Sequence, residues 1–126
     1  MARVLVIDDD QPLRDLFREL LARGGHRAEA FATAKEGLAR LEAEQVDLVV
    51  TDVIMPETDG LETIREIRRT HPGVRVVAVS GGGAYEGLDY LHLAKLMGAN
   101  ATLSKPVRMQ KLLSTVAEVL ELDPPG

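Results

Sequence analysis

The sequence predicts an α/β fold in which one parallel sheet lies between two layers of helices. Short aliphatic runs alternate five times with longer segments whose apolar residues recur at helical spacing, a pattern typical of repeated βα units. Several of these runs are almost continuously apolar, as strands covered on both faces require. The length of 126 residues, with 45% hydrophobic and 28% charged residues, suits a single domain.

The first two units follow from residues 3–41. Residues 3–7 are nearly all aliphatic and predict a buried strand, and Pro12 suits the first turn of the helix that follows. Residues 26–31 alternate weakly and predict an edge strand. Thr33 and Glu36 have the spacing of a capping box at the start of the second helix. The first helix carries its apolar stripe at Leu13, Leu16, Phe17, Leu20 and Leu21, and the second at Ala34, Leu38 and Leu41.

The remaining three units occupy residues 46–120. Strands are predicted over 46–51 and 74–79, both rich in aliphatic residues, and over 101–104, a short strand that Lys105-Pro106 ends. A helix with an apolar stripe follows each of them. The first begins with a second capping-box pair, Asp59 and Glu62, carries its stripe over residues 61–67 and is closed by His71-Pro72-Gly73, and the others span residues 88–97 and 109–120. Right-handed crossovers then give a doubly wound, flavodoxin-like (βα)5 sheet with strand order 2-1-3-4-5. A closed eight-unit barrel would need about twice this length.

Composition excludes several classes of function. The chain has no cysteine, which excludes disulfides and thiolate chemistry. A net charge of -5 and 3% aromatic residues disfavour direct nucleic-acid binding. No apolar run approaches the length of a membrane span, and no signal peptide precedes the first strand. We therefore expect a cytoplasmic protein with one domain over residues 1–122 and a short tail over 123–126.

Polar residues stand where four of the predicted strands end. They are Asp8 and Asp9, Asp52, Ser80, and Lys105. The carboxyl ends of parallel strands share one edge of the sheet, and ligands bind there, so we expect these residues to converge. Carboxylates about 4 Å apart repel by roughly 4 kcal/mol at an effective dielectric near 20, so a cation or a proton must neutralise them.

An all-oxygen set with so few carboxylates favours Mg²⁺, which keeps several waters and leaves room for phosphate oxygens. Such a site is equipped for phosphoryl transfer. In this scheme Asp52 is the nucleophile, and Asp8 and Asp9 hold the ion. Lys105 neutralises the incoming phosphoryl group, and Ser80 donates a hydrogen bond to one of its oxygens.

Together these motifs resemble the receiver domain of bacterial two-component response regulators. The match rests on Asp8-Asp9, the run Asp52-Val53-Ile54-Met55-Pro56 with Gly60, Ser80, and Lys105-Pro106, and it covers residues 3–120. The resemblance implies that a histidine kinase or phosphotransfer protein phosphorylates Asp52. It implies Mg²⁺ ligands at Asp9, Asp52 and the main-chain carbonyl of Ile54, with Asp8 assisting. It also implies a cis peptide before Pro106, and a signalling module that catalyses only its own phosphorylation and dephosphorylation.

Three positions depart from the family pattern. Thr102 stands where receivers usually carry an aromatic residue whose rotamer follows the state of the hydroxyl residue. Ile54 and Gly82 occupy positions where polar side chains can orient an attacking water, and neither can do so. The phosphoryl group is therefore expected to leave Asp52 slowly.

Other interpretations remain open. Asp10 is expected only to stabilise the first helix through its dipole, and Arg65, Arg68 and Arg69 to form a solvated helix face. Instead of a phosphoacceptor that switches a protein partner, the chain could be a pseudo-receiver scaffold, a small aspartyl-phosphate phosphotransferase or a flavin carrier. The intact acidic residues disfavour a scaffold, and scarce aromatics disfavour flavin. The sequence leaves open whether the chain acts alone or is part of a longer regulator.

Overall fold

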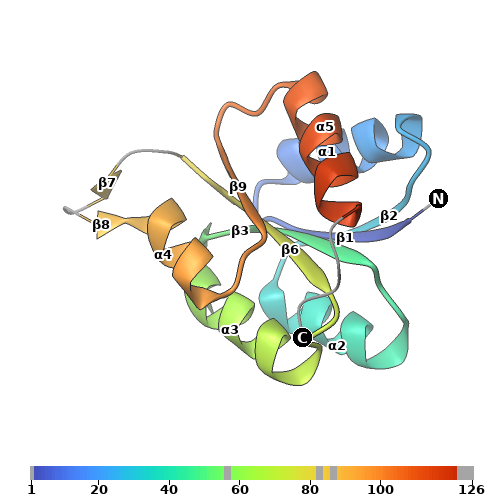
Figure 1. Cartoon of the computed structure of the whole chain (residues 1–126). Helices are drawn as coiled ribbons and strands as arrows, with labels where there is room; N and C mark the ends of the chain where they lie inside the picture. Colours follow the sequence, from blue (N-terminus) through green and yellow to red (C-terminus); the bar gives the residue numbers. More distant parts are fainter. Residues whose placement is uncertain (1, 56–57, 82–83, 86–87, 122–126) are drawn as a thin grey trace.

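The sheet has the predicted topology. A computed structural model describes residues 2–55, 58–81, 84–85 and 88–121, and its main sheet has five parallel strands in the order β2-β1-β3-β6-β9. In chain order this is 2-1-3-4-5, the doubly wound order expected from the sequence (Figure 1). The strands are β1 (Arg3–Ile7), β2 (Arg27–Phe31), β3 (Leu48–Asp52), β6 (Arg75–Ser80) and β9 (Ala101–Ser104).

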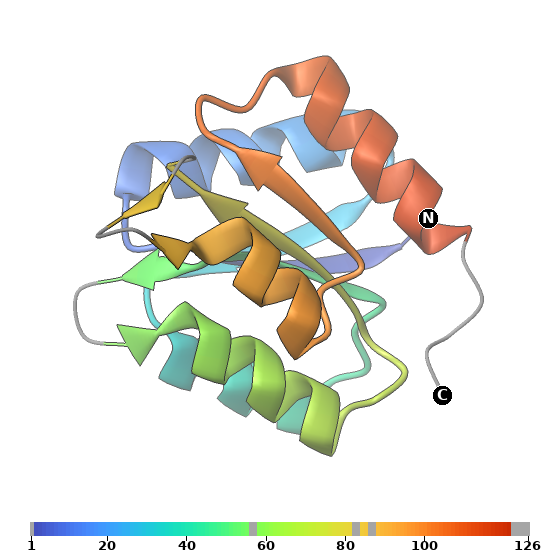
Figure 2. The ribbon, with the colours of Figure 1, turned by 60° about the vertical axis from the view of Figure 1, so that its left-hand side comes forward.

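Helices cover both faces of this sheet (Figure 2). Each central strand is buried on both faces because its side chains alternate between two apolar clusters. On β1, Val4 and Val6 join the cluster that packs with α1 and α5, whereas Leu5 and Ile7 join the cluster that packs with α2, α3 and α4. The helices are α1 (Gln11–Arg23), α2 (Ala34–Ala43), α3 (Gly60–Thr70), α4 (Tyr90–Met97) and α5 (Met109–Leu120).

Side-chain caps set the starts of two helices. Asp10 is the N-cap of α1, and its Oδ1 accepts a hydrogen bond from the Leu13 amide at 3.2 Å, so its expected stabilising role at this helix is confirmed. Thr33 caps α2 in the same way, since its Oγ1 accepts from the Glu36 amide at 3.2 Å and donates to Glu36 Oε1 at 3.0 Å. The predicted N-cap at Thr33 is therefore confirmed, with Glu36 bonded to the Thr33 hydroxyl rather than to its amide as in a full capping box. The box predicted at Asp59 lies outside the described side chains.

Several boundaries differ from the sequence prediction. Strand β3 begins at Leu48 rather than at residue 46, and α4 begins at Tyr90 rather than at residue 88. Two short antiparallel pairs were not predicted, β4 (Ile54–Met55) with β5 (Thr58–Asp59) and β7 (Ala84–Tyr85) with β8 (Leu88–Asp89). Both pairs precede a helix on the side of the sheet where the strands end, and two-residue strands carry no periodicity that a sequence pattern reveals.

Arg68 does not belong to a solvated helix face, which corrects the expectation from sequence. Its guanidinium is partly buried and donates to the carbonyl oxygens of Pro72, Val74 and Gly98 at 2.9, 2.7 and 2.7 Å, and to Asn100 Oδ1 at 3.1 Å. Burial lowers the pKa of Arg68. The side chain therefore ties the end of α3 to the turn that follows α4, whereas Arg65 and Arg69 are exposed as expected.

Two glycines permit close backbone approaches near the strand ends. A Cβ on Gly60 at the start of α3 would lie 2.3 Å from the Val53 carbonyl oxygen, and one on Gly37 of α2 would lie 2.5 Å from Cδ1 of Ile7. Neither space admits a side chain without movement of its neighbours. Among the residues that the structure describes, none of the helices has the length and apolar character needed to cross a bilayer.

Candidate functional site

The predicted site residues converge at the carboxyl edge of the sheet. Asp8 follows β1, Asp52 ends β3, and Ser80 ends β6. These three side chains are almost fully buried, with exposed fractions of 1%, 5% and 3%. Lys105 follows the last strand, β9, and reaches the same edge. Elements far apart in sequence therefore meet at one place because the strands are parallel and pair in this order.

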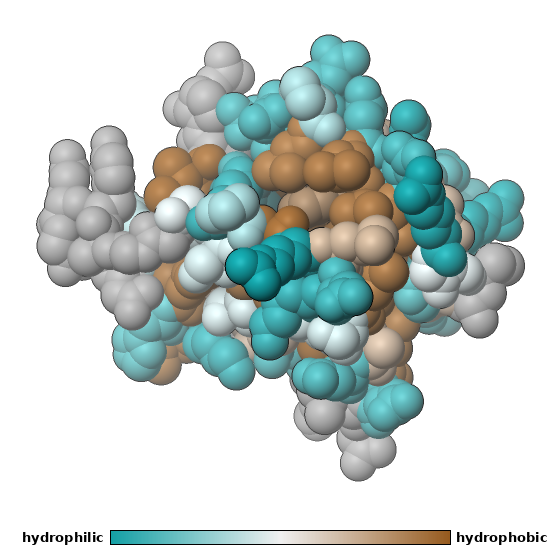
Figure 3. Space-filling view, turned by 90° about the horizontal axis from the view of Figure 1, so that it is seen from above, coloured by the Kyte–Doolittle hydropathy of each residue, from teal (hydrophilic) through white to brown (hydrophobic). Residues whose placement is uncertain are grey.

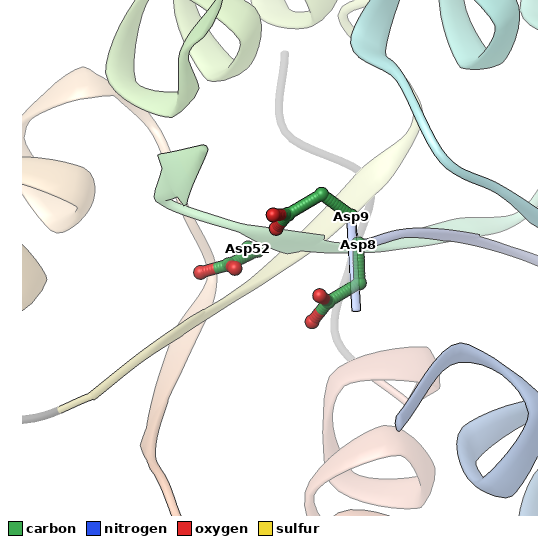
Figure 4. A group of neighbouring side chains, drawn as sticks. All are labelled: Asp8, Asp9 and Asp52. Carbon is green, nitrogen blue, oxygen red and sulfur yellow. The ribbon is translucent and has the colours of Figure 1, made fainter. Parts of the chain in front are cut away.

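Three carboxylates form the centre of the site (Figure 4). One oxygen each from Asp8, Asp9 and Asp52 lies within 4.8 Å of the others, and Asp9 is the exposed member of the group. Asp8 Oδ1 accepts a hydrogen bond from the Asp10 amide at 2.9 Å. Asp8 Oδ2 is buried and accepts no hydrogen bond. Its cationic partner is the Lys105 ammonium, 3.3 Å away.

Lys105 is the cation that faces this group. Its Nζ lies 3.2 Å from Asp52 Oδ2 and 3.3 Å from Asp8 Oδ2, so one ammonium bridges two buried carboxylates. The Lys105 amide donates to the Ser80 carbonyl at 2.7 Å, which holds the start of the β9–α5 loop against the end of β6. The Lys105–Pro106 peptide bond is cis, as the resemblance implied.

The electrostatics of Asp52 show that one ammonium does not neutralise the site. Burial and the neighbouring Asp8 charge raise the pKa of Asp52, and they outweigh the Lys105 ammonium and the Ile54 amide, which lower it. Burial lowers the pKa of Lys105, but the Asp52 and Asp8 carboxylates raise it further, so it lies above its ordinary value. The Lys105 ammonium therefore does not offset the combined effect of burial and of the Asp8 charge on the Asp52 carboxylate.

Ile54 contributes through its main chain and borders the site with an apolar side chain. Its amide donates to Asp52 Oδ1 at 3.2 Å, and its residue surface is 43% exposed. Thr102 is half-buried and lies on β9 opposite Ala78 of β6. This position therefore carries a small polar side chain and not an aromatic ring. Gly82 lies outside the described residues.

Arg14 is a residue of this region that the sequence did not single out. It lies in the second turn of α1, and its Nη1 donates to the Asp8 main-chain carbonyl at 2.9 Å. The bond ties α1 to the end of β1 and so fixes the turn that carries Asp8 and Asp9. A signal existed in the sequence, since Arg14 follows the N-cap Asp10 by four residues and so lies about one turn into the helix, near the acidic loop.

The arrangement fits a hard divalent cation. Three carboxylates, one of them with a buried oxygen that accepts no hydrogen bond, form an all-oxygen donor set at the surface. Such a donor set is suited to Mg²⁺ rather than to soft metals. The buried Asp52 carboxylate lies beside both this cluster and Lys105. The site can therefore place positive charge next to an attacking carboxylate and next to the oxygens of a phosphoryl group, as phosphoryl transfer requires.

Comparisons with known proteins agree with this geometry. The response regulator receiver domain family matches residues 4–117. A 14.6 kDa protein of Leptolyngbya boryana is 37% identical over 97% of this chain and 92% of its own. The response regulator MprA of Mycolicibacterium vanbaalenii is 31% identical over 98% of this chain and 52% of its own length.

The fold comparison gives the same result. The crystal structure of a CheY-like response regulator receiver domain protein from Methanospirillum hungatei superposes with a TM-score of 0.88. That protein is 31% identical, and the match covers 96% of this chain and 94% of the other. The chain spans a quarter to about half of the length of the first three curated relatives that it matches. With the family matched over nearly the whole sequence, the chain belongs to the receiver domains of two-component response regulators.

Proposed function

We propose that this chain is a phosphoacceptor whose Asp52 takes a phosphoryl group from a histidine kinase or a phosphotransfer protein. The modified domain then changes its affinity for a downstream protein partner. One observation carries this proposal: the buried Asp52 carboxylate lies within 4.8 Å of two further acidic residues and 3.2 Å from the Lys105 ammonium. A carboxylate that served only structure would not require this concentration of charge.

The proposed transfer is a single displacement at phosphorus. An Asp52 carboxylate oxygen forms the new O–P bond, the N–P bond of the phosphohistidine breaks, and the released imidazole nitrogen takes a proton. Lys105 lies close enough to Asp52 to neutralise the charge of the transferred group. Ser80 ends β6 beside the last residue of β3, from where its hydroxyl can donate to a phosphoryl oxygen.

The proposed metal ligands are Asp8, Asp9, Asp52 and the main-chain carbonyl of Ile54. Bound Mg²⁺ would supply positive charge to the phosphoryl oxygens and orient them. Burial and the Asp8 charge together raise the pKa of Asp52 in spite of the Lys105 ammonium, and Asp8 Oδ2 is buried with Lys105 as its cationic partner. A further cation would therefore stabilise the charged carboxylates, which supports this assignment. The protein prepares the site by fixing the acidic turn through Arg14 and through the Asp10 amide.

The output side of the proposal involves α4, β9 and α5. Lys105 connects the site to these elements because it directly follows β9 and leads into the loop before α5. A phosphoryl group on Asp52 gives Lys105 a new anionic partner and so alters the loop. The domain limits of residues 1–122, the tail over 123–126, action as a single domain and a cytoplasmic location remain predictions.

The test is the intact mass of the protein after incubation with acetyl phosphate and Mg²⁺. We expect wild type to gain one phosphoryl group and Asp52→Asn to gain none. Asp15→Asn is the matched control, because this carboxylate lies on α1 and its side chain is 54% exposed. Chelation of the metal should abolish the gain in wild type.

The outcomes separate the alternatives. A wild-type protein that gains no mass under these conditions is a scaffold and not a phosphoacceptor. Steady release of phosphate with many turnovers per minute would instead indicate a phosphotransferase or phosphatase that works on small molecules. A yellow chromophore that co-purifies would indicate a flavin carrier.

A further inference from the structure

The outer edge of β2 lies on the side of the sheet away from the proposed output elements. The strand order puts β2 at one edge of the sheet and β9 at the other, and Figure 2 shows β9 in front of the central strands and β2 behind them. β2 pairs with β1 on one side, and no strand among the described residues pairs with its other side. An edge of this kind can accept a strand from another chain.

The pairing with β1 identifies the main-chain groups that face outward. The Arg27 amide donates to the Ala2 carbonyl at 2.8 Å, so Arg27 directs its main chain toward β1. In a parallel pair every second residue does so, and Glu29 therefore also faces β1. Ala28 and Ala30, which alternate with them, direct their amides and carbonyls away from the sheet. These are the groups that a further strand would bind.

The side chains of this edge carry opposite charges two residues apart. Glu29 accepts hydrogen bonds from the Arg40 guanidinium of α2 at 2.7 and 2.8 Å. That contact, with the nearby Arg3 and Arg27 charges, lowers the pKa of Glu29 and keeps it ionised at neutral pH. Arg27 is exposed, and its guanidinium forms no hydrogen bond or ion pair with any residue that the structure describes. Because side chains alternate along a strand, Arg27 and Glu29 lie on the same face of the sheet.

Two copies of this edge are complementary when they run antiparallel about a two-fold axis at Ala28. Each Ala28 then lies opposite Ala28 of the partner subunit, and the two residues exchange both main-chain hydrogen bonds. Arg27 lies opposite Glu29 of the partner subunit, and Glu29 lies opposite the partner's Arg27. These are pairs without main-chain hydrogen bonds, whose side chains approach most closely, and opposite charges there stabilise the pairing.

The same charges oppose another register. Charged side chains on an edge strand usually prevent pairing with a second chain. A two-fold axis at Glu29 would also bring outward-facing residues together, but it would place two Glu29 carboxylates opposite each other, which destabilises the pair. The charges therefore act against this register and favour the one centred on Ala28.

The helical surface over α1 and α5 has no comparable pattern. Figure 3, seen from that side, shows apolar surface interspersed with hydrophilic side chains. Leu16 of α1 and Met109 of α5 are exposed there, but isolated exposed apolar residues are common on monomeric proteins. The β2 edge differs because its main-chain groups and its charges both match a second copy of the same sequence.

We infer that two copies of this chain associate through β2, antiparallel and centred on Ala28, so that two five-stranded sheets form one continuous sheet. Such an interface is isologous, since the same residues contribute from both subunits. The strands are short, so the interface is small and the association is weak and depends on concentration. Because β9 is the opposite edge, the contact leaves Lys105 and the proposed output elements uncovered. The inference does not rest on phosphorylation.

The first test is sedimentation equilibrium of wild type at increasing concentration. We expect the mean mass to rise from that of one chain toward that of two between about 10 μM and about 1 mM, as for a Kd near 0.1 mM. Amide hydrogen exchange of Ala28 and Ala30 should slow over this range, because their amides become bonded in the dimer. Exchange of the Glu29 amide, which faces β1, should change little.

Charge reversal tests the register. Arg27→Glu alone places Glu opposite Glu29 of the partner subunit, and Glu29→Arg alone places Arg opposite the partner's Arg27. Each variant should dimerise at least about tenfold more weakly than wild type. In an equimolar mixture both facing pairs become opposite in charge, so the mixed dimer should form about as readily as the wild-type dimer. Native mass spectrometry distinguishes it from the two homodimers by mass.

A proline tests the main-chain contact without a change of charge. Ala28→Pro removes the amide that bonds across the two-fold axis, and an edge strand tolerates proline where the missing amide faces away from the sheet. We expect this variant to remain monomeric and folded by circular dichroism. Arg65→Glu reverses an exposed charge on α3 and is the matched control, which should dimerise like wild type.

Several results would overturn the inference. They are a wild type that stays monomeric at about 1 mM, a dimer that Arg27→Glu leaves unchanged, a mixture of the two charge variants without a mixed dimer, and exchange at Ala28 that does not depend on concentration. If Ala28→Pro does not fold, the charge variants decide. A chain that dimerises through β2 but takes no phosphoryl group refutes the proposed function and leaves the β2 contact supported.

Discussion

Replacing Asp52 by asparagine should stabilise the metal-free protein, although it removes the proposed nucleophile. At an effective dielectric near 20, carboxylates that lie within 4.8 Å of one another repel by at least about 3 kcal/mol per pair, and an ion pair at 3.2 Å attracts by about 5 kcal/mol. Asp52 has two acidic neighbours and one ammonium, so these contributions nearly cancel. The cost of burying the Asp52 charge then decides whether the carboxylate stabilises or destabilises the fold. This cost amounts to several kcal/mol per ion.

We expect Asp52→Asn to raise the free energy of unfolding by about 1–3 kcal/mol, because the amide has the shape of the carboxylate and no charge. The gain is limited to this range because a buried amide still needs hydrogen-bond partners. For a chain of this size, that corresponds to an increase in Tm of about 3–10 °C. The assay is thermal unfolding followed by circular dichroism at pH 7 in the presence of a chelator. Asp15→Asn should change the free energy by less than about 0.5 kcal/mol.

The pH dependence of stability tests independently whether Asp52→Asn stabilises the protein. The pKa of Asp52 is raised above its ordinary value of 3.8, so the folded state binds more protons than the unfolded state as the pH passes through this window. Wild type therefore loses stability as the pH rises from 3.8 through the folded pKa. The advantage of Asp52→Asn should vanish below pH 3.8 and be complete at pH 7. A variant that is less stable than wild type at pH 7 without metal would refute the reasoning.

Mg²⁺ should remove most or all of the stability advantage of Asp52→Asn over wild type. A ligand at one hundred times its dissociation constant stabilises the folded state by about 2.7 kcal/mol. We expect this gain in wild type and a much smaller one in Asp52→Asn, which lacks one of the three clustered carboxylates. Equal gains in both proteins would place the ion elsewhere.

Three further perturbations test other parts of the molecule. Gly60→Ala should destabilise by about 2–3 kcal/mol in urea unfolding, because its Cβ would lie 2.3 Å from the Val53 carbonyl oxygen. Arg68→Met should cost about 3 kcal/mol, since it removes a cation that donates to four oxygens. The phosphoryl group on Asp52 should survive for longer than seconds with Mg²⁺ present, because Ile54 offers no polar side chain to an attacking water, and Ile54→Asn should shorten its lifetime severalfold.

Matched substitutions control for non-specific effects. Gly73→Ala should be neutral or stabilising by up to about 1 kcal/mol, since no atom lies within 4 Å of the added Cβ. Arg65→Met removes an exposed arginine from the same helix as Arg68 and should change stability by less than about 0.5 kcal/mol. Equal losses for Arg65 and Arg68 would contradict the role given to the Arg68 hydrogen bonds, and a wild-type phosphoryl half-life of seconds would contradict the role of Ile54.

The strand pattern was predictable because burial on both faces leaves a strong signal. Strand β1 begins and ends at the residues that its aliphatic run predicts, Arg3–Ile7, and β9 spans the predicted residues Ala101–Ser104, just before Lys105-Pro106. Strand β3 starts two residues later than its apolar run, because Val46 precedes the pairing with β1 and packs at the margin of a core cluster. Hydropathy reports burial, whereas strand limits also depend on pairing.

Convergence of the acidic residues with Lys105 was predictable for a topological reason. In a sheet of parallel strands with this order, the carboxyl ends of the strands lie at one edge, regardless of the length or sequence of the helices and loops between them. The burial of Asp8 and Asp52 and the bridging position of Lys105 required the structure, since side-chain contacts depend on packing. The chemical roles of these residues stay predictions until phosphorylation is measured.

Arg68 shows what a helical pattern misses. Its neighbours Arg65 and Arg69 are exposed ion-pair partners, and the sequence places all three on one polar helix. Arg68 differs because the turn after α4 comes close enough to accept its hydrogen bonds from Gly98 and Asn100. That approach depends on residues about 30 positions away, beyond the reach of a local pattern.

The contact between Gly37 and Ile7 offers a way to change the geometry of the site by a substitution outside it. Ile7 is followed directly by Asp8, and a methyl group at position 37 would press on the Ile7 side chain from beneath the sheet. Substituting position 37 with a series of increasingly large residues would shift the acidic turn by small steps without replacing any charged residue. Such a series offers a way to retune the proposed magnesium site without changing any of its proposed ligands.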